Sequence, residues 1–417
     1  NFLRYIIGKK SPGNTRIYIQ RSDRSRFQMY TLFVTRGYPT ERYKTYGIFE
    51  FDQAKALVQQ GCKVVYAAVD LRSIRRWRKW GIRKQLINGV YVYEINIPLG
   101  RIPKPLLRKI SYIALRILYN RIINDQGKPD IIHAQFFDQV YAASRLKDAT
   151  NIPLIITEHS SQINKENIDD EVFQIARMAY HKAEALIAVS PSLAKVIKRK
   201  FNRDSVYIPN MVDLSVFKYK GKRQNEGFHF VSAGNLIDVK RMDLLIEAFY
   251  EAFSNNPEVT LTIFGEGNKR GMLEDLIERY KLASQVQLMG LCDRSKIAEQ
   301  LEKSDCFALA SRSETFGVAY IEALAMGVPV IATKCGGPEI FVDESNGVLI
   351  DVDNKEELIK AMQYMYNNIN KYDKREIAKK TKERFSYETA AKRIMEVYHE
   401  VLIQNGRDSL GEKSWNQ

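Results

Sequence analysis

Two glutamates in one short stretch are the residues of this sequence best suited to chemistry. Glu322 is the only charged residue of the helical pattern VAYIEALAM, and Glu314 lies eight residues earlier, in the loop before that helix. An unpaired carboxylate in an otherwise buried helix costs on the order of several kcal/mol, so Glu322 must accept hydrogen bonds. The helix opens at Gly317, and its N-terminus presents free N–H groups that suit a phosphate. The stretch indicates a phosphate-binding site, unless Glu322 only satisfies a helix cap or an internal arginine.

The elements that must position these residues follow a regular alternation of short apolar runs and helical stretches. Helices are predicted for 47–61, for a long stretch to about Asn124, near 138–147, near 171–182 and after Pro191, and again between the later strands. Strand, helix and strand at this spacing predict parallel βαβ units. The predicted strands are 29–35, 63–69, 89–97, 130–134, 153–159, 185–190, 228–234, 259–265, 286–290, 306–311, 328–333 and 347–350.

The alternation of predicted strands and helices is interrupted once, at the charged and glycine-containing stretch FKYKGKRQNEG. We therefore expect an α/β protein with two doubly wound parallel-sheet domains and a cleft between them, since ligands bind beyond the carboxyl ends of such strands. The predicted parts are an N-terminal extension (1–28), a first domain (29–217), a linker (218–227), a second domain (228–385), a terminal helix (386–404) that crosses back to the first domain, and a tail (405–417).

The stretch around the two glutamates, SRSETFGVAYIEALAMGVPVIATKCGG, strongly resembles the donor-binding signature of family 4 glycosyltransferases, which have the GT-B fold. Further segments match that family in the expected order, and the resemblance covers about residues 29–404. It implies two Rossmann-like domains facing each other across a cleft. The other matching segments are PDIIHAQ, PLIITEHS, IPNMVDLSVF, SAGNLIDVKRMDLLIEAF and TIFGEGNKRGMLE.

The resemblance implies a role for each matching residue. Glu322 would hold the ribose hydroxyls of a nucleotide sugar, and Glu314 would lie near the hydroxyls of the donor sugar. Lys240 would neutralise the leaving diphosphate, and His159 would face the reacting sugar from the first domain. Gly47 and Tyr46 would lie on the acceptor side. The backbone amides of Phe316, Gly317 and Val318 would hold the distal phosphate, and the remaining donor-binding positions are Gly234, Asn235, Arg241 and Gly265.

Each of these positions also has a purely structural interpretation. His159 could be a core histidine that bonds a backbone carbonyl, and His133 is expected to be a structural residue. Lys240 could be a solvated lysine at a helix start, and Gly47 could relieve crowding between helix and strand.

Four positions depart from the family pattern. Asn235 stands where an arginine usually accompanies the lysine, and Arg241 follows Lys240 where glycine is common. Tyr46 replaces the first of two glycines, and Met211 replaces the glycine of P-N-G-V-D. These changes concern the phosphate geometry and the acceptor loop, and Arg241 either supplies the missing charge or points to solvent.

We expect no metal and no other cofactor. Asp351 and Asp353 form the sequence DVD, but they precede a helix, where capping is the better interpretation. Lys240 and helix N-termini would replace a divalent ion as the counter-charge of the phosphates. The four cysteines lie far apart, which indicates neither a disulfide framework nor a zinc site and favours a reduced, cytoplasmic setting.

Charge is the most unusual feature of the composition. The 417 residues carry 64 Lys and Arg against 49 Asp and Glu, a formal charge of +15, and no apolar run is long enough for a transmembrane helix. Segment 71–84 alone holds seven basic residues and no acid. It is interpreted as an anionic-membrane patch, with a solvated loop or a nucleic-acid contact as alternatives. The predicted patch residues are Arg75, Arg76, Trp77, Arg78, Lys79 and Trp80.

Together with the resemblance, which implies retention of configuration, these observations predict a metal-independent glycosyltransferase that uses a UDP- or GDP-type sugar. The expected acceptor is a hydroxyl of a lipid-linked or polysaccharide glycan for the cell surface, such as a capsule. The expected location is cytoplasmic, at the inner face of the membrane, with no nucleic-acid partner. The alternatives are a glycosyltransferase with a small soluble acceptor and a non-catalytic protein that binds nucleotide sugars or nucleic acid.

Overall fold

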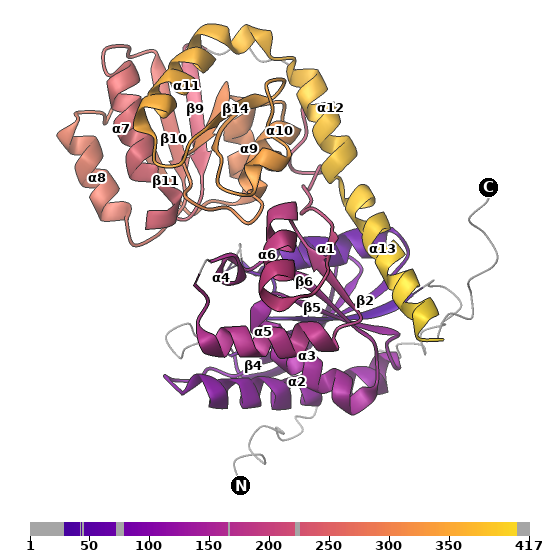
Figure 1. The fold of residues 1–417 in the computed structure, drawn as a ribbon. Coiled ribbons are helices and arrows are strands. Elements are labelled where there is room, and N and C mark those ends of the chain that lie inside the picture. The colour runs from indigo at the N-terminus through magenta and orange to yellow at the C-terminus, as the bar shows by residue number, and fades with distance from the viewer. Residues whose placement is uncertain are drawn as a thin grey trace, which may run out of the picture. The chain divides into compact units, whose positions relative to one another are not determined.

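The computed structural model describes residues 29–41, 43, 46–71, 79–165, 167–221 and 226–406. Figure 1 shows that these residues form two sheets with helices along their faces. Three predicted regions lie wholly or partly outside the described residues: the N-terminal extension, residues 222–225 of the linker and the tail beyond Gly406. Four residues of the predicted membrane patch, Arg75, Arg76, Trp77 and Arg78, also lie outside them.

The first sheet has eight strands in the order β3-β4-β2-β1-β5-β6-β7-β8. The strand β1 is buried along its whole length and pairs in parallel with β2 on one side and with β5 on the other. The order reverses between β1 and β5, which is typical of a doubly wound sheet. The strands are β1 (Tyr30–Thr35), β2 (Lys63–Asp70), β3 (Gly81–Ile87), β4 (Val90–Asn96), β5 (Ile131–Gln135), β6 (Leu154–Glu158), β7 (Ala185–Ala188) and β8 (Val206–Tyr207).

Helices connect these strands at the predicted places. Gly47, with a φ of 70°, precedes the first of them, and the long stretch before Asn124 is a single helix of 23 residues. The helices are α1 (Ile48–Gln59), α2 (Lys104–Gln126), α3 (Phe137–Thr150), α4 (Ser161–Asn164), α5 (Asp170–Lys182) and α6 (Pro191–Phe201).

The second sheet has six strands in the order β11-β10-β9-β12-β13-β14, and all its recorded pairings are parallel. Its strands are β9 (Phe228–Ala233), β10 (Val259–Phe264), β11 (Val286–Gly290), β12 (Cys306–Leu309), β13 (Val330–Thr333) and β14 (Gly347–Ile350). The helices in this part of the chain are α7 (Met242–Phe253), α8 (Arg270–Arg279), α9 (Arg294–Glu302), α10 (Val318–Ala325), α11 (Lys355–Asn368), α12 (Lys374–Phe385) and α13 (Tyr387–Gln404), with short 3₁₀ turns η2 (Asp238–Lys240), η3 (Pro338–Ile340) and η4 (Ile369–Lys371).

The predicted fold class, two parallel-sheet α/β domains, is confirmed. Two strands were not predicted: the two-residue β8, and β3, which pairs antiparallel with β4 and begins with Gly81–Lys84, the end of the basic segment 71–84. The alternative of a solvated loop is therefore wrong for residues 81–84, whereas residues 72–78 lie outside the described residues. The apolar residues of β3 alternate too weakly with charged ones to predict a strand, and pairing with the buried β4 decides the conformation. Lys79 and Trp80, which precede β3, are exposed.

Contacts divide the chain into two compact units whose limits differ from the predicted domains. One unit comprises Asn1–Glu158, Ile168–Ile187 and Ile394–Gln417, and the other comprises His159–Asn167 and Ala188–Arg393. The C-terminal part of α13 thus groups with the first sheet. There the Tyr398 hydroxyl lies 2.5 Å from His133 Nδ1, in the buried core.

Candidate active site

The second sheet gathers polar side chains where its strand order reverses. The chain runs outward from β9 to β10 and β11, and then returns to β12, which pairs with the other side of β9. The loops after β9 and β12 therefore leave the sheet side by side, where open α/β sheets bind ligands. One of these loops carries Lys240 and the other carries Glu314.

Lys240 and Glu314 form a hydrogen-bonded ion pair. Lys240 Nζ donates to Glu314 Oε1 at 2.5 Å, and Ser311 Oγ donates to the same oxygen at 2.8 Å. Glu314 is 9% exposed, so the pair is largely shielded from water. A cation and an anion held in contact at a shielded edge can bind both a phosphate and a hydroxyl group.

Glu322 has the partner that its burial requires. It lies on α10, is 8% exposed, and its Oε1 is 3.3 Å from Nε of Arg294, the first residue of α9. The internal arginine that the sequence left open as an alternative is therefore present beside Glu322.

The N-terminus of α10 has the backbone geometry that the sequence predicts. Gly317 caps the helix with a φ of 95°, in the left-handed region that favours glycine. The N–H groups of Phe316, Gly317 and Val318 donate to no acceptor within the described part of the chain. The Phe316 side chain is buried and packs against Phe341 and Phe385, with ring centroids 5.3 and 5.8 Å away. The aromatic contacts of Phe316 thus anchor the backbone that carries these N–H groups.

Two glycines allow the loops after β9 and β10 to touch through their backbones. The N–H of Gly234 donates to the carbonyl of Phe264 at 2.9 Å, and the N–H of Gly265 donates to that of Gly290 at 2.9 Å. A Cβ on Gly265 would lie 1.8 Å from the carbonyl oxygen of Gly234. Gly265 is thus required for backbone packing. Asn235, the next residue of the β9 loop, is exposed.

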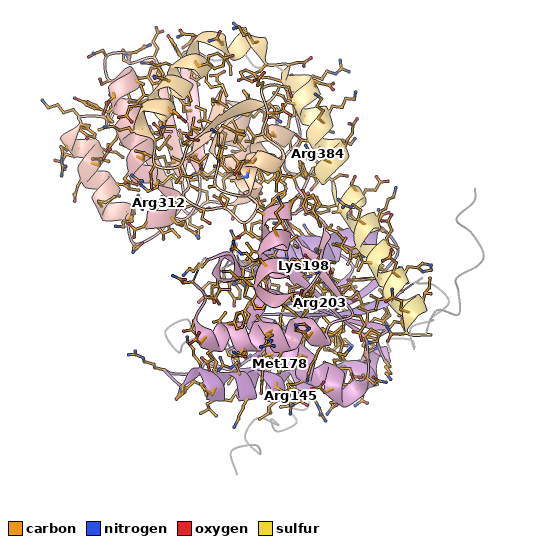
Figure 2. The ribbon with its side chains drawn as sticks, in the orientation of Figure 1. Arg145, Met178, Lys198, Arg203, Arg312 and Arg384 are labelled. Atoms are coloured by element: carbon orange, nitrogen blue, oxygen red, sulfur yellow. The ribbon has the colours of Figure 1, made fainter. Side chains whose placement is uncertain are left out.

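Arg241 does not supply a free charge to the loop. Its Nε lies 3.1 Å from both oxygens of Asp243, and its guanidinium also pairs with Asp353. Arg312, labelled in Figure 2, donates from Nε to the same Asp353 at 2.7 Å. Exposure to solvent, one of the two predicted outcomes for Arg241, does not occur, because its side chain is 14% exposed and pairs with two carboxylates. Replacement of the missing charge stays a prediction.

The interpretation of Asp351 and Asp353 as helix caps is wrong. Asn354 caps α11, because its side chain accepts from the N–H of Glu357 at 3.0 Å. Asp351 instead pairs with Lys334 at 2.7 Å, and Asp353 pairs with the two arginines. Nearby cations compete successfully for both carboxylates, which the spacing to the helix alone could not reveal. No cluster of three or more potential metal ligands occurs among the residues described.

The first sheet places other predicted residues after β1. A Cβ on Gly47 would lie 2.2 Å from the carbonyl oxygen of Gly37, so this glycine lets the backbone before α1 approach the loop after β1. The ring of Tyr46 covers Gly37: a Cβ there would lie 2.3 Å from Tyr46 Cε1. The same loop thus has no room for side chains at either glycine.

His159 directly follows β6 and is 9% exposed. The next residue, Ser160, caps α4 by accepting from the N–H of Gln162 at 3.1 Å. His133 differs, since its ring is fully buried on β5 and lies 2.7 Å from Thr157 Oγ1 as well as against Tyr398. His133 is therefore a core residue, as expected.

Three residues of these loops were not predicted. Arg294 pairs with Glu322, and Ser311 donates to Glu314. The only feature of the sequence that pointed to either residue was the need of the buried Glu322 for a partner. Arg36 follows β1 at the reversal point of the first sheet, pairs with the buried Glu50 at 3.3 Å, and lies 4.2 Å from the ring centroid of Phe136. Its neighbours come from α1 and from the end of β5, so only the fold brings them together.

Two ionisable groups beside the Glu314 loop are neutral. Burial raises the pKa of Cys335 to about 11. Burial also raises the pKa of Tyr320 well above its ordinary value, and its hydroxyl donates to the carbonyl of Leu309 at 2.9 Å. The charges at this edge are therefore those of the lysine, the arginines and the carboxylates.

Comparison with known families decides the identity of the fold. Residues 51–216 match the model described as "Glycosyltransferase Family 4", and residues 217–384 match the model described as "Glycosyl transferases group 1". The chain belongs to the family 4 glycosyltransferases. The two matched ranges together run from within α1 to the end of α12, and β1 lies before them.

Relatives of this glycosyltransferase come from distant organisms. An uncharacterized glycosyltransferase of Methanocaldococcus jannaschii is 27% identical over 301 residues, which are 70% of this chain and 82% of that protein. A phosphatidylinositol N-acetylglucosaminyltransferase protein of Homo sapiens is 27% identical over 253 residues. That match covers 56% of this chain and 52% of the human protein, so the chain spans about half the length of this relative.

Solved structures share the fold of this glycosyltransferase. Sucrose-phosphate synthase from Thermosynechococcus elongatus superposes with a TM-score of 0.75 at 19% identity, over 90% of this chain and 99% of that one. HepE of Anabaena in complex with UDP superposes with a TM-score of 0.67 at 19% identity, over 89% and 100%. These likenesses establish the GT-B fold. No helix in the described part of the chain is both long and apolar enough to span a membrane.

Proposed function

We propose that this glycosyltransferase moves a sugar, with retention, from a UDP- or GDP-type nucleotide sugar to a hydroxyl of a lipid-linked or polysaccharide acceptor in cell-surface glycan synthesis. The observation that carries the proposal is the ion pair of Lys240 and Glu314 at the reversal point of the second sheet. Structures of related fold support the donor class, since one was solved with UDP and another with UDP and glucose.

The donor would bind along the carboxyl edge of the second sheet. Glu322, whose carboxylate pairs with Arg294, accepts hydrogen bonds from the two ribose hydroxyls. Lys240 and the N–H groups of Phe316, Gly317 and Val318 neutralise the diphosphate, and Glu314 lies near the sugar hydroxyls. The loop residues Gly234, Asn235, Arg241 and Gly265 complete the proposed donor site.

The reaction would exchange two bonds on one face of the sugar. The bond between the anomeric carbon and the phosphate oxygen breaks, and a bond to the acceptor oxygen forms on the same side. The departing phosphate oxygen takes the acceptor proton, so no carboxylate base is needed. Stabilising the leaving charge is worth about 3–4 kcal/mol per hydrogen-bond donor. His159 would orient or stabilise the positively charged sugar, and Gly47 and Tyr46 would line the acceptor side.

The acceptor class rests on charge. A net charge of +15 favours an anionic surface, which supports a lipid-linked acceptor at the inner face of the membrane. Two alternatives make different predictions: an enzyme with a soluble acceptor would not need an anionic surface, and a non-catalytic nucleotide-sugar binder would bind the donor without turnover.

A thermal-shift panel of UDP, GDP, ADP and their sugars tests the donor site. Ligand at about 100 times its dissociation constant should stabilise the protein by about 2.7 kcal/mol. Glu322→Ala should abolish the shift, and Glu322→Gln, which retains the shape beside Arg294, should weaken it. The matched control is Glu274→Ala, which removes an exposed glutamate of α8. The donor assignment fails if no nucleotide shifts the transition, or if both Glu322 variants shift as the wild type does.

His159→Ala tests catalysis separately. The variant should bind the donor as the wild type does, with a rate of sugar transfer or donor hydrolysis lowered by at least about tenfold. An unchanged rate would remove the catalytic role of His159, and donor binding without turnover in the wild type would favour the non-catalytic alternative.

A further inference from the structure

The charged residues of α2 are not placed where they would favour the helix macrodipole. A helix favours acids in its first turn and bases in its last, because its macrodipole is positive at the N-terminus. α2 has no acid in its first turn and no base in its last, and among its first 21 residues Lys104, Arg108, Lys109, Arg116 and Arg121 are basic and none is acidic. Of these cations, only Arg121 has an acidic partner within the helix, Asp125 at 3.4 Å, so the others are not explained by the charges of α2 itself.

Several of these cations have no carboxylate partner within the described residues. Arg108 pairs with Glu171 and Arg121 lies 3.4 Å from Asp125, but Lys104, Lys109 and Arg116 pair with no acid there. Arg116 instead donates to the Tyr112 hydroxyl at 3.1 Å. A helix surface with uncompensated cations is suited to an anionic partner from outside the chain.

The exposed side of α2 is also apolar. Leu106 and Ile113 are 48% and 49% exposed, and they alternate with the exposed Lys109 and Arg116. The intervals of three and four residues place these four side chains on one stripe, about 15 Å long at 1.5 Å per residue. We call them the α2 stripe: Leu106, Lys109, Ile113 and Arg116.

A further cation lies beside this helix. Arg145 of α3, labelled in Figure 2, lies 5.9 Å from the ring centroid of Tyr112, and Arg116 lies at the same distance from that ring. The region around the α2 stripe therefore combines apolar side chains with several positive charges.

We propose that the α2 stripe docks on an anionic lipid surface, with Leu106 and Ile113 inserted among the acyl chains near the headgroups. A helix that lies in a membrane interface carries apolar residues and adjoining Lys and Arg, as this stripe does. Half-exposed leucine and isoleucine have no use on a phosphate backbone, which argues against nucleic acid. The inference rests on the proposed function for its purpose, since a lipid-linked acceptor is presented at such a surface.

Sedimentation with vesicles tests the proposal. The full-length protein should sediment with vesicles of equal parts phosphatidylcholine and phosphatidylglycerol, and much less with phosphatidylcholine alone. The double variant K109A/R116A should lower the vesicle partition coefficient by about 30-fold, from about fivefold per removed cation. The matched control K380A/K382A removes two exposed cations of α12, which are not part of the α2 stripe, and should change the coefficient by less than about twofold.

A second variant separates the apolar contribution. L106S/I113S should lower the partition coefficient also at high salt, whereas K109A/R116A should resemble the wild type there. The proposal is overturned if the wild type does not bind the anionic vesicles, if the control loses as much binding as K109A/R116A, or if L106S/I113S binds normally. Retention on polyuridylate without vesicle binding would indicate nucleic acid instead.

The same variants distinguish this inference from the proposed function. Thermal shifts with UDP and GDP should be unchanged in all three, because α2 belongs to the first sheet and the donor residues to the second. If the wild type binds nucleotide normally but does not bind vesicles, the docking proposal is refuted and the donor assignment is not. Vesicle binding without any nucleotide shift refutes the donor assignment alone.

Discussion

Arg241 has a left-handed backbone, with a φ of 49°, at a position where resembling sequences commonly have glycine. A side chain in this region costs about 1–2 kcal/mol, because its Cβ approaches the following carbonyl oxygen. Arg241 offsets that cost through Asp243 and Asp353. Since Arg312 bonds the same Asp353, the network joins the loops that carry Lys240 and Glu314.

Two substitutions at this position separate strain from ion pairing. Arg241→Gly and Arg241→Ala both remove the ion pairs, but only glycine removes the strain. We expect Arg241→Gly to be about 1 kcal/mol more stable than Arg241→Ala, measured as the free energy of unfolding in urea. Equal stabilities would show that the left-handed backbone is not strained.

The Cys335 thiol should be unreactive near neutral pH. Burial is the main cause that raises its pKa to about 11, so the thiolate fraction at pH 7 is about one in ten thousand. Alkylation by iodoacetamide, followed by mass spectrometry of the Cys335 peptide, should accelerate as the pH rises toward 11. Fast labelling at pH 7 in the folded protein would contradict this expectation.

At the scale of elements, the loops of the donor edge depend on close backbone contact. A methyl group at Gly265 would lie 1.8 Å from the carbonyl oxygen of Gly234, and the φ of 145° also favours glycine. Gly265→Ala should therefore destabilise the protein by more than about 1 kcal/mol and weaken nucleotide binding. Gly271→Ala, on α8, is the control, because a Cβ there meets nothing within 4 Å. If Gly265→Ala and Gly271→Ala lost stability to a similar extent, the backbone contact of Gly265 would not be the cause of the loss.

Asp125 attaches the C-terminal end of α2 to the first sheet. Its carboxylate accepts from Lys84 Nζ at 3.0 Å and from the Tyr93 hydroxyl at 3.1 Å. Burial tends to raise the pKa of Asp125, but Lys84, Tyr93 and Arg121 outweigh it, so the pKa is lowered. A carboxyl group with a lowered folded-state pKa stabilises the protein above its unfolded-state value, near 4, and loses this contribution as the pH falls.

The consequence is a pH-dependent effect of Asp125→Asn. At pH 7 the melting temperature of the variant should be lower than that of the wild type. The difference between the two melting temperatures should shrink as the pH falls below about 4, because the wild-type carboxyl group then becomes protonated. Differential scanning calorimetry from pH 7 to below pH 4 measures both melting temperatures. A difference that is constant with pH would mean that the charge of Asp125 does not contribute.

At the scale of the whole molecule, a metal requirement can be tested directly. Lys240 and the N–H groups at the start of α10 are proposed to balance the diphosphate without a divalent ion. Donor turnover should therefore be unchanged in excess EDTA. Loss of turnover that added magnesium or manganese restores would refute metal independence.

Much of the fold and part of the candidate site follow from local sequence. The strand β1 and the helix α10 lie where apolar runs and the flanking Gly317 and Gly327 predict them. The antiparallel β3 was not predicted, since its exposed, charged residues form a strand only by pairing with β4. The helix-cap interpretation of Asp351 and Asp353 is wrong for a related reason: their partners Lys334, Arg241 and Arg312 are distant in sequence or belong to other loops.

By itself, the sequence determined the alternation of strands and helices, the two-domain α/β class and the family. These depend on periodicity and on ordered motifs, which are local properties of the chain. Only the tertiary structure decided that Arg294 is the partner of Glu322, that Lys240 contacts Glu314, and that the cations of α2 face outward beside Leu106 and Ile113. Such contacts depend on the strand order and on the rotation of each helix about its axis, which the packing of the whole chain sets.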